Sequence, residues 1–170
     1  MLNTHYYGGI KKYQWVATPL AVHGVVFLKN GKKVSFAIGE KEEDPVFCIP
    51  DILPHLSRNV QDDRKTREVI KGEELKVLFG SIPVKDKDAK EKIKANILEH
   101  LKKDYGIEEE DFFSAEIEIV PALKARDIGL DRGMIGAYGQ DDRICAYTSL
   151  KALLDIKKPE KTVLCYFADK

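Results

Sequence analysis

The strongest chemical candidate in the sequence is a histidine that follows a pair of closely spaced prolines. His55 lies in the run Ile49-Pro50-Asp51-Ile52-Leu53-Pro54-His55-Leu56. Each proline fixes its own φ angle, so together they bend the chain and hold the imidazole at a defined place on a turn. An imidazole so placed can exchange protons or donate hydrogen bonds near neutral pH, or it can simply cap the next helix. The pattern leaves both interpretations open.

A second candidate is the carboxylate pair Asp141-Asp142 in the segment Gly136-Ala137-Tyr138-Gly139-Gln140-Asp141-Asp142-Arg143. The residues that follow have helical spacing, so the pair lies at a helix start, where the helix dipole stabilises it by a few tenths to about 1 kcal/mol. An N-cap and a first-turn acid would explain the pair structurally. A carboxylate ringed by glycines is also a suitable ligand for zinc or a hard metal.

Other chemical motifs are weak. His5, His23 and His100 are interpreted as packed or surface histidines. The glycines before Asp141 match neither a dinucleotide fingerprint nor a phosphate loop, and no His-Glu-x-x-His or Gly-x-Ser-x-Gly motif occurs. The charge run Lys85–Lys94 is typical of a solvated helix face.

The elements that must position these residues begin with a hairpin. Asn30-Gly31 favours a two-residue type I′ turn, because both central positions then need positive φ. Pairing outward from that turn predicts that six residues share one face of the sheet. The predicted pairs are Phe27 with Val34, Val25 with Phe36, and His23 with Ile38.

A helix is predicted over residues 84–106. Its apolar residues form one stripe at helical spacing: Ile93, Ile97, Leu98 and Leu101. We expect Asp86 or Asp88 to cap its start and Gly106 to end it in the left-handed conformation. Residues 115–120 alternate as in a half-buried strand that Pro121 stops. The charged segment 61–74 fits either a helix or a loop.

The last thirty residues predict a different fold class from the residues before them. Arg143–Ile156 has the pattern of a helix, and Thr162–Ala168 is a continuous apolar run typical of a strand buried on both faces. Helix, loop and buried strand are half of a βαβ unit. We therefore expect the chain to be cut from a longer protein, within a second, α/β domain.

Composition narrows the function classes. The 28 Lys+Arg balance 28 Asp+Glu, so the net charge is zero, which argues against a nucleic-acid partner. Charged residues make up 33%, and no apolar run is long enough to span a membrane. Three well-separated cysteines and the absence of a signal-peptide pattern favour a cytoplasmic protein.

A family resemblance then adds to these patterns. From Gly129-Leu130-Asp131-Arg132 through Tyr138–Tyr147 the sequence resembles the aspartyl aminopeptidase and aminopeptidase I family, zinc exopeptidases that assemble as homo-oligomers, typically tetrahedral dodecamers of dimers. Three shorter stretches also resemble it: Tyr6-Tyr7-Gly8-Gly9-Ile10, Ile49-Pro50 with His55-Leu56, and Phe167-Ala168-Asp169-Lys170. The resemblance covers the whole chain but well under half of a family member.

The resemblance implies roles for two residues. Asp141 matches the aspartate that bridges the two zinc ions, a role suited to a carboxylate because each oxygen can bind one metal. His55 matches a histidine that the family's inserted domain extends into the neighbouring protomer's active site, where it stabilises the substrate or the tetrahedral intermediate. The other zinc ligands and the general-base glutamate are expected before Met1 and after Lys170.

The predicted fold class is α+β. Residues 1–121 would form the inserted β-rich domain with one packed helix, serving oligomerisation and as an active-site lid, and residues 122–170 a partial α/β, βαβ-type piece of the catalytic domain. The whole enzyme would remove N-terminal residues from peptides by metal-activated water attack. The segment alone is expected to be inactive, because a zinc site needs at least three protein ligands.

Two alternatives from other classes stay open. The chain could be a non-catalytic oligomerisation module that forms a homodimer or dodecamer. It could also be an unrelated α/β domain with a single magnesium ion at Asp141-Asp142, although the lack of a phosphate loop counts against that interpretation.

Overall fold

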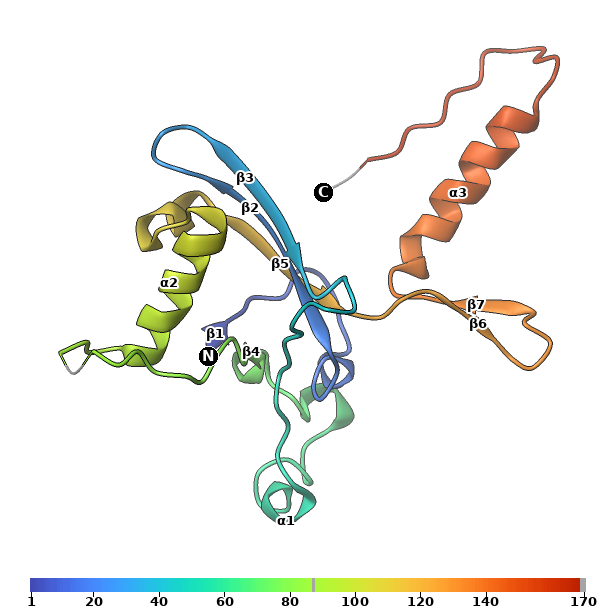
Figure 1. The fold of residues 1–170 in the computed structure, drawn as a ribbon. Helices are drawn as coiled ribbons and strands as arrows, with labels where there is room; N and C mark the ends of the chain where they lie inside the picture. Colours follow the sequence, from blue (N-terminus) through green and yellow to red (C-terminus); the bar gives the residue numbers. More distant parts are fainter. Residues whose placement is uncertain (87, 169–170) are drawn as a thin grey trace. The chain divides into compact units, whose positions relative to one another are not determined.

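The computed structural model describes residues 1–86 and 88–168. The chain divides into two compact units, Met1–Ala122 and Leu123–Lys170. Figure 1 shows the elements of each unit. The stretch Phe167–Lys170, one of those that resemble the peptidase family, extends outside the described residues at Asp169 and Lys170.

A three-stranded antiparallel sheet organises the first unit. The strands are ordered β3-β2-β5, so β2 lies in the centre (Figure 1). Their bounds are Leu20–Phe27 for β2, Lys33–Ile38 for β3 and Glu116–Pro121 for β5. The alternating pattern that predicts a strand over residues 115–120 is confirmed by β5, which ends at the proline. Proline is tolerated there because β5 is an edge strand.

The hairpin β2–β3 forms, but its predicted register is wrong. Val26 pairs with Val34, Gly24 with Phe36 and Val22 with Ile38, one residue from the prediction on β2. His23, Val25 and Phe27 therefore lie on the face opposite to the predicted one, because successive side chains alternate between faces.

The turn geometry explains this shift. The amide of Gly31 donates to the carbonyl of Leu28 at 2.8 Å, and the amide of Leu28 donates to the carbonyl of Lys32 at 2.9 Å. Gly31 alone is left-handed in this loop, with φ of +80°. This is a three-residue loop with a glycine bulge, in place of the two-residue type I′ turn that Asn30-Gly31 favours.

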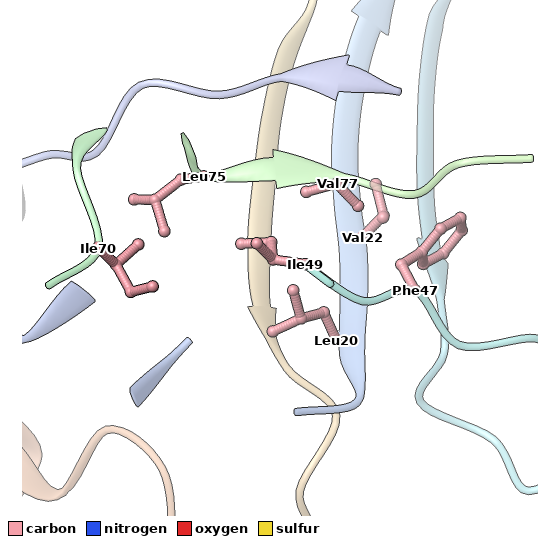
Figure 2. Packing of buried hydrophobic residues seen from close by; sticks show 7 residues of the cluster. All are labelled: Leu20, Val22, Phe47, Ile49, Ile70, Leu75 and Val77. Carbon is pink, nitrogen blue, oxygen red and sulfur yellow. The ribbon is translucent and has the colours of Figure 1, made fainter. Parts of the chain in front are cut away.

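Two apolar clusters stabilise the first unit. The larger one lies where β2 meets the segments that flank the His55 loop, and Figure 2 shows its buried members: Leu20, Val22, Phe47, Ile49, Ile70, Leu75 and Val77. The smaller one joins the sheet to the long helix and contains Val26, Leu101 and Ile107. Both clusters contain residues of β2, since Leu20 and Val22 belong to the larger one and Val26 to the smaller one, and each of the three is almost fully buried.

The long helix α2 spans Lys92–Tyr105, which is shorter than predicted. Asp86 and Asp88 do not cap it; instead the Asp86 carboxylate accepts a hydrogen bond from the Asp88 amide at 2.9 Å, as in an Asx turn. The predicted end is confirmed, since Gly106 is left-handed with φ of +73°. The predicted apolar stripe is confirmed in part: Leu101 is buried and Ile97 packs against the same cluster as β2, whereas Ile93 is exposed.

The remaining elements of the first unit are short. They are the strands β1 (Leu2–Asn3) and β4 (Lys76–Val77), which pair with each other, the helix α1 (Pro54–Ser57), and four 3₁₀ turns at Lys12–Gln14, Thr66–Glu68, Gly72–Glu74 and Glu109–Ser114. The charged segment 61–74 is thus a loop with two 3₁₀ turns.

The second unit consists of a hairpin and a helix. Strands β6 (Arg126–Ile128) and β7 (Met134–Gly136) pair antiparallel, and α3 spans Gln140–Asp155. The helix predicted over 143–156 is confirmed. The strand predicted over 162–168 is wrong for the described residues: this segment has no pairing partner there, and side chains such as Leu164 and Tyr166 are exposed.

The α+β fold class is confirmed at this coarse level, with small antiparallel sheets and two main helices. Within the described ranges, no helix is long and apolar enough to cross a membrane.

A buried aspartate joins the hairpin tip to the 3₁₀ turn before β5. Asp111 is 6% exposed, and its carboxylate accepts hydrogen bonds from the amides of Lys29 at 3.1 Å and Glu108 at 2.9 Å. We expect Asp111→Ala to lower the free energy of unfolding by about 1–3 kcal/mol, because it leaves both amides without their acceptor. Urea denaturation measures this. The exposed Asp104→Ala is the matched control, and an equal effect of the two would contradict the assigned role.

Candidate functional site

His55 lies in α1, on a bend that the prolines shape as predicted. Pro54 is the first helical residue, and Leu53 before it is extended with ψ of 150°. The imidazole is exposed, and among the described residues it has no hydrogen-bond or ion-pair partner. No side-chain cap of α1 is found. The ring is therefore presented outward and is not used to cap a helix.

The loop around His55 exposes several apolar side chains. Four hydrophobic side chains of the same loop are between 38% and 63% exposed: Ile52, Leu53, Leu56 and Val60. A loop that exposes so many apolar groups beside one imidazole suits contact with another surface better than contact with water.

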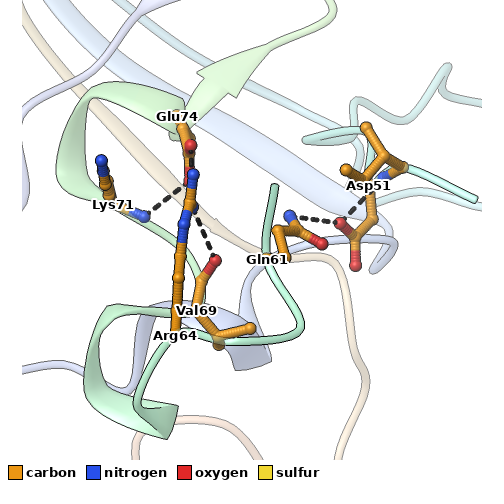
Figure 3. A network of polar contacts seen from close by, with 7 residues as sticks. Asp51, Gln61, Arg64, Val69, Lys71 and Glu74 are labelled. Atoms are coloured by element: carbon orange, nitrogen blue, oxygen red, sulfur yellow. Dashed lines mark hydrogen bonds and ion pairs between the residues drawn. The ribbon is translucent and has the colours of Figure 1, made fainter. Parts of the chain in front are cut away.

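A polar network ties this loop to the core. Gln61 donates from Nε2 to Oδ1 of Asp51 at 3.2 Å. Arg64 donates from Nη1 to both carboxylate oxygens of Glu74, at 3.0 and 2.9 Å, and to the carbonyl of Val69 at 3.1 Å (Figure 3). Leu75, next to Glu74, belongs to the larger core cluster. The network thus links the loop that carries His55 to buried residues.

The environment of Glu74 favours its ionised form. Partial burial acts to raise the pKa, but the amide of Lys71, at 2.8 Å, and the guanidinium of Arg64 outweigh it and hold the pKa of Glu74 below its ordinary value of 4.5. A carboxylate with a lowered pKa stabilises the fold above its unfolded pKa, and that contribution is lost as the pH falls through the folded value.

The lowered pKa of Glu74 predicts how the stability of the fold depends on pH. Below about pH 4.5 the wild-type chain should lose stability partly through protonation of Glu74, whereas Glu74→Gln should lack that part of the pH dependence. Urea denaturation between pH 7 and pH 3 measures the difference. The adjacent, exposed Glu73→Gln is the control, and a Glu74→Gln curve parallel to wild type would exclude the proposed stabilisation.

Asp141 lies at the predicted helix start, where α3 is broken. Its backbone is extended (φ −85°, ψ 122°), and its peptide bond to Asp142 is cis. No side-chain cap is found at this helix start, and in the described chain the Asp141 carboxylate has no hydrogen-bond or ion-pair partner. The Asp142 carboxylate instead raises the pKa of the Cys145 thiol by a hydrogen bond and by its charge. Asp141 is thus left with both oxygens available to a ligand.

The described residues do not form a complete metal site. Among them, no group of three or more His, Cys, Asp or Glu side chains could hold a metal ion. Since catalytic zinc requires three protein ligands, the donors of this part of the chain do not fit zinc by themselves. His55 and Asp141 belong to different units, Met1–Ala122 and Leu123–Lys170.

Comparison with known proteins decides the family. The profile of the aminopeptidase I zinc metalloprotease family (M18) matches residues 1–170, which is the whole sequence. The chain belongs to the M18 family. The resemblance stated from the sequence is therefore confirmed. A curated relative, the probable M18 family aminopeptidase 1 of Borrelia garinii subsp. bavariensis, is 58% identical over 170 residues, 99% of this chain and 37% of that protein.

Solved M18 structures are similar as well. The aminopeptidase of the M18 family from Thermotoga maritima is 55% identical, with a TM-score of 0.84 over 94% of this chain and 34% of that one. Aminopeptidase I from Clostridium acetobutylicum is 58% identical, with a TM-score of 0.83 over 95% of this chain and 35% of its own. The M18 chain thus spans about a third of the length of these relatives.

The sequence pointed to His55 and Asp141, whose side chains have no hydrogen-bond partner in the described parts of the chain. It did not point to the polar network that holds the His55 loop. The structure also corrects His23, which lies off the apolar face and contacts Glu40 through its Nε2 at 2.6 Å. The network residues come from the charged segment 61–74, where Arg64 and Glu74 are ten residues apart. The segment is a loop with two 3₁₀ turns, where neither the helix nor the strand period applies, so no sequence signal marks the pair.

Proposed function

We propose that these 170 residues are an internal segment of a zinc-dependent aminopeptidase that removes N-terminal residues from peptides. The M18 match over the whole sequence carries the proposal, and the coverage of about 37% of the relatives supports a longer enzyme. Met1–Ala122 would be the inserted β-rich domain and Leu123–Lys170 a partial catalytic domain of α/β type.

Within that enzyme Asp141 would be the bridging carboxylate of a two-zinc site. Its free carboxylate at a broken helix start supports this role, and the other ligands would come from residues outside these 170. Zinc, when bound, would supply a Lewis acid and an activated water. This chain would supply one carboxylate, on the first turn of α3, with both oxygens available to bind metal.

His55 would serve the active site of a neighbouring protomer. Its exposed ring and the apolar side chains around it support contact with a second copy, as a homodimer or as a dodecamer built from dimers. There it would donate a hydrogen bond to the substrate or to the tetrahedral intermediate. The free thiols of Cys48, Cys145 and Cys165 support a cytoplasmic location.

The chain by itself is expected to be inactive. A peptidase assay of the purified 170 residues with added zinc or cobalt should show no turnover, and calorimetric zinc titration should show no tight site, because Asp141 has too few companion ligands. Turnover by the chain would contradict its expected inactivity and the assignment of the other zinc ligands to residues outside these 170. Sedimentation of the same sample tests the second candidate, a non-catalytic self-association module, which the exposed apolar loop favours.

A further inference from the structure

We infer that Asp51 and Gln61 form a clamp that positions His55, a role that rests on the function proposed for His55. The clamp is the hydrogen bond from Gln61 Nε2 to Asp51 Oδ1 at 3.2 Å, between residues ten apart on either side of α1 (Figure 3). An imidazole that acts on substrate must be held in one geometry. Since the ring has no partner within the described residues, its segment must supply that rigidity.

The helix that carries His55 is too short to supply it. α1 has four residues and no side-chain cap, and its apolar neighbours Leu53 and Leu56 are exposed. Isolated helices of this length are unstable in water, because nucleation fixes several residues for one hydrogen bond. The fixed conformation of this segment therefore depends on contacts at its two ends.

The first end is fixed through Asp51. The same Oδ1 that accepts from Gln61 also accepts from the amide of Ile52 at 2.8 Å, which holds the carboxylate against its own backbone. Two residues earlier, Ile49 is 3% exposed and its carbonyl accepts from the amide of Ala17 at 2.9 Å. Asp51 thus presents a fixed acceptor to the far side of the loop.

The second end is fixed through Gln61. Its amide donates to the carbonyl of Ser57 at 2.7 Å, in a turn that the amides of Val60 and Asp62 also join. Its own carbonyl accepts from the amide of Arg64 at 2.9 Å, and Arg64 is held by Glu74 beside the core. Gln61 therefore connects the turn after His55 to the buried cluster.

Hydrogen exchange in the intact enzyme tests the clamp without relying on activity. Asp51→Ala and Gln61→Ala should each speed exchange of the hydrogen-bonded amides in 52–60 by about 5-fold, the effect of one lost hydrogen bond. Asp51→Asn keeps an Oδ1 acceptor and should stay near wild type. Asp62→Ala, a neighbouring exposed acid, is the matched control. Unchanged exchange in the first two variants overturns the clamp.

Kinetics of the same variants test positioning. Gln61→Ala should lower kcat on the order of 10-fold with KM and zinc content unchanged, because small misplacement of a catalytic group slows the reaction. In a His55→Ala background Gln61→Ala should lower kcat no further. A full additional loss there, or no loss in the single variant, overturns positioning. No effect of His55→Ala itself would instead overturn the proposed function, while the exchange result would still decide the clamp.

Discussion

Asp141→Ala in the intact enzyme is expected to lower kcat/KM by more than about 100-fold and to reduce bound zinc, since loss of outer-shell partners alone costs 10- to 100-fold. The physical reason is that a bridging carboxylate binds both metals, and alanine offers no donor atom. The carboxylate caps no helix and accepts no hydrogen bond from residues 1–86 or 88–168, so its removal breaks no hydrogen bond within that part of the chain. Metal analysis of the purified variant, together with peptide hydrolysis, measures both effects.

A second acid on the same helix provides the control. Asp155 lies at the other end of α3 and forms an exposed ion pair with Lys151 at 2.8 Å. Asp155→Ala should leave zinc content and kcat/KM close to wild type, because an exposed ion pair contributes little. Full zinc content and activity in Asp141→Ala would exclude Asp141 as a ligand.

His55→Ala in the intact enzyme is expected to lower kcat by roughly 10²- to 10³-fold, the loss typical when one donor to a developing oxyanion is removed. Zinc content should not change, because the role proposed for His55 is to donate a hydrogen bond to the substrate or intermediate, not to bind the metal. The fold should also tolerate the change, since the ring is exposed and makes no hydrogen bond within the described residues. Steady-state kinetics and metal analysis separate these effects.

The matched control for His55 is His100, an exposed histidine on α2. His100→Ala should leave kcat unchanged. Equal kcat values for wild type and His55→Ala would mean that His55 has no role in the reaction.

The hairpin and the long helix show which parts of the fold follow from sequence and which do not. The hairpin position follows from Asn30-Gly31, but loops of two and three residues differ by one register step. The apolar pattern could not decide between the two loop lengths, because β2 carries apolar residues on both faces.

The end of α2 can be predicted from Gly106. The start of α2 cannot, because the lysines and acids in the sequence before Lys92 suit either a helix or a loop. The Val84 amide donates to the Lys92 carbonyl at 3.1 Å, which is not a helical hydrogen bond.

Long-range partners explain the remaining differences. The apolar run 162–168 has strand composition, but a strand also needs a neighbour, and none pairs with it among the residues described.

One part of the candidate site can likewise be predicted from the sequence and another part cannot. His55 and Asp141 stand out locally, through two prolines and through glycines at a helix start. The Asp51–Gln61 and Arg64–Glu74 contacts depend on how the loop folds back, which no local pattern encodes.

Subunit complementation tests the central claim most directly, namely that His55 of one protomer completes a zinc site that contains Asp141 of another. His55→Ala and Asp141→Ala enzymes, each nearly inactive, are dissociated, mixed in equal amounts and reassembled. Random pairing in a twofold dimer should restore about a quarter of wild-type activity, because half of the dimers are mixed and each holds one complete site. Mixed oligomers that form but stay as inactive as the separate variants would contradict the claim.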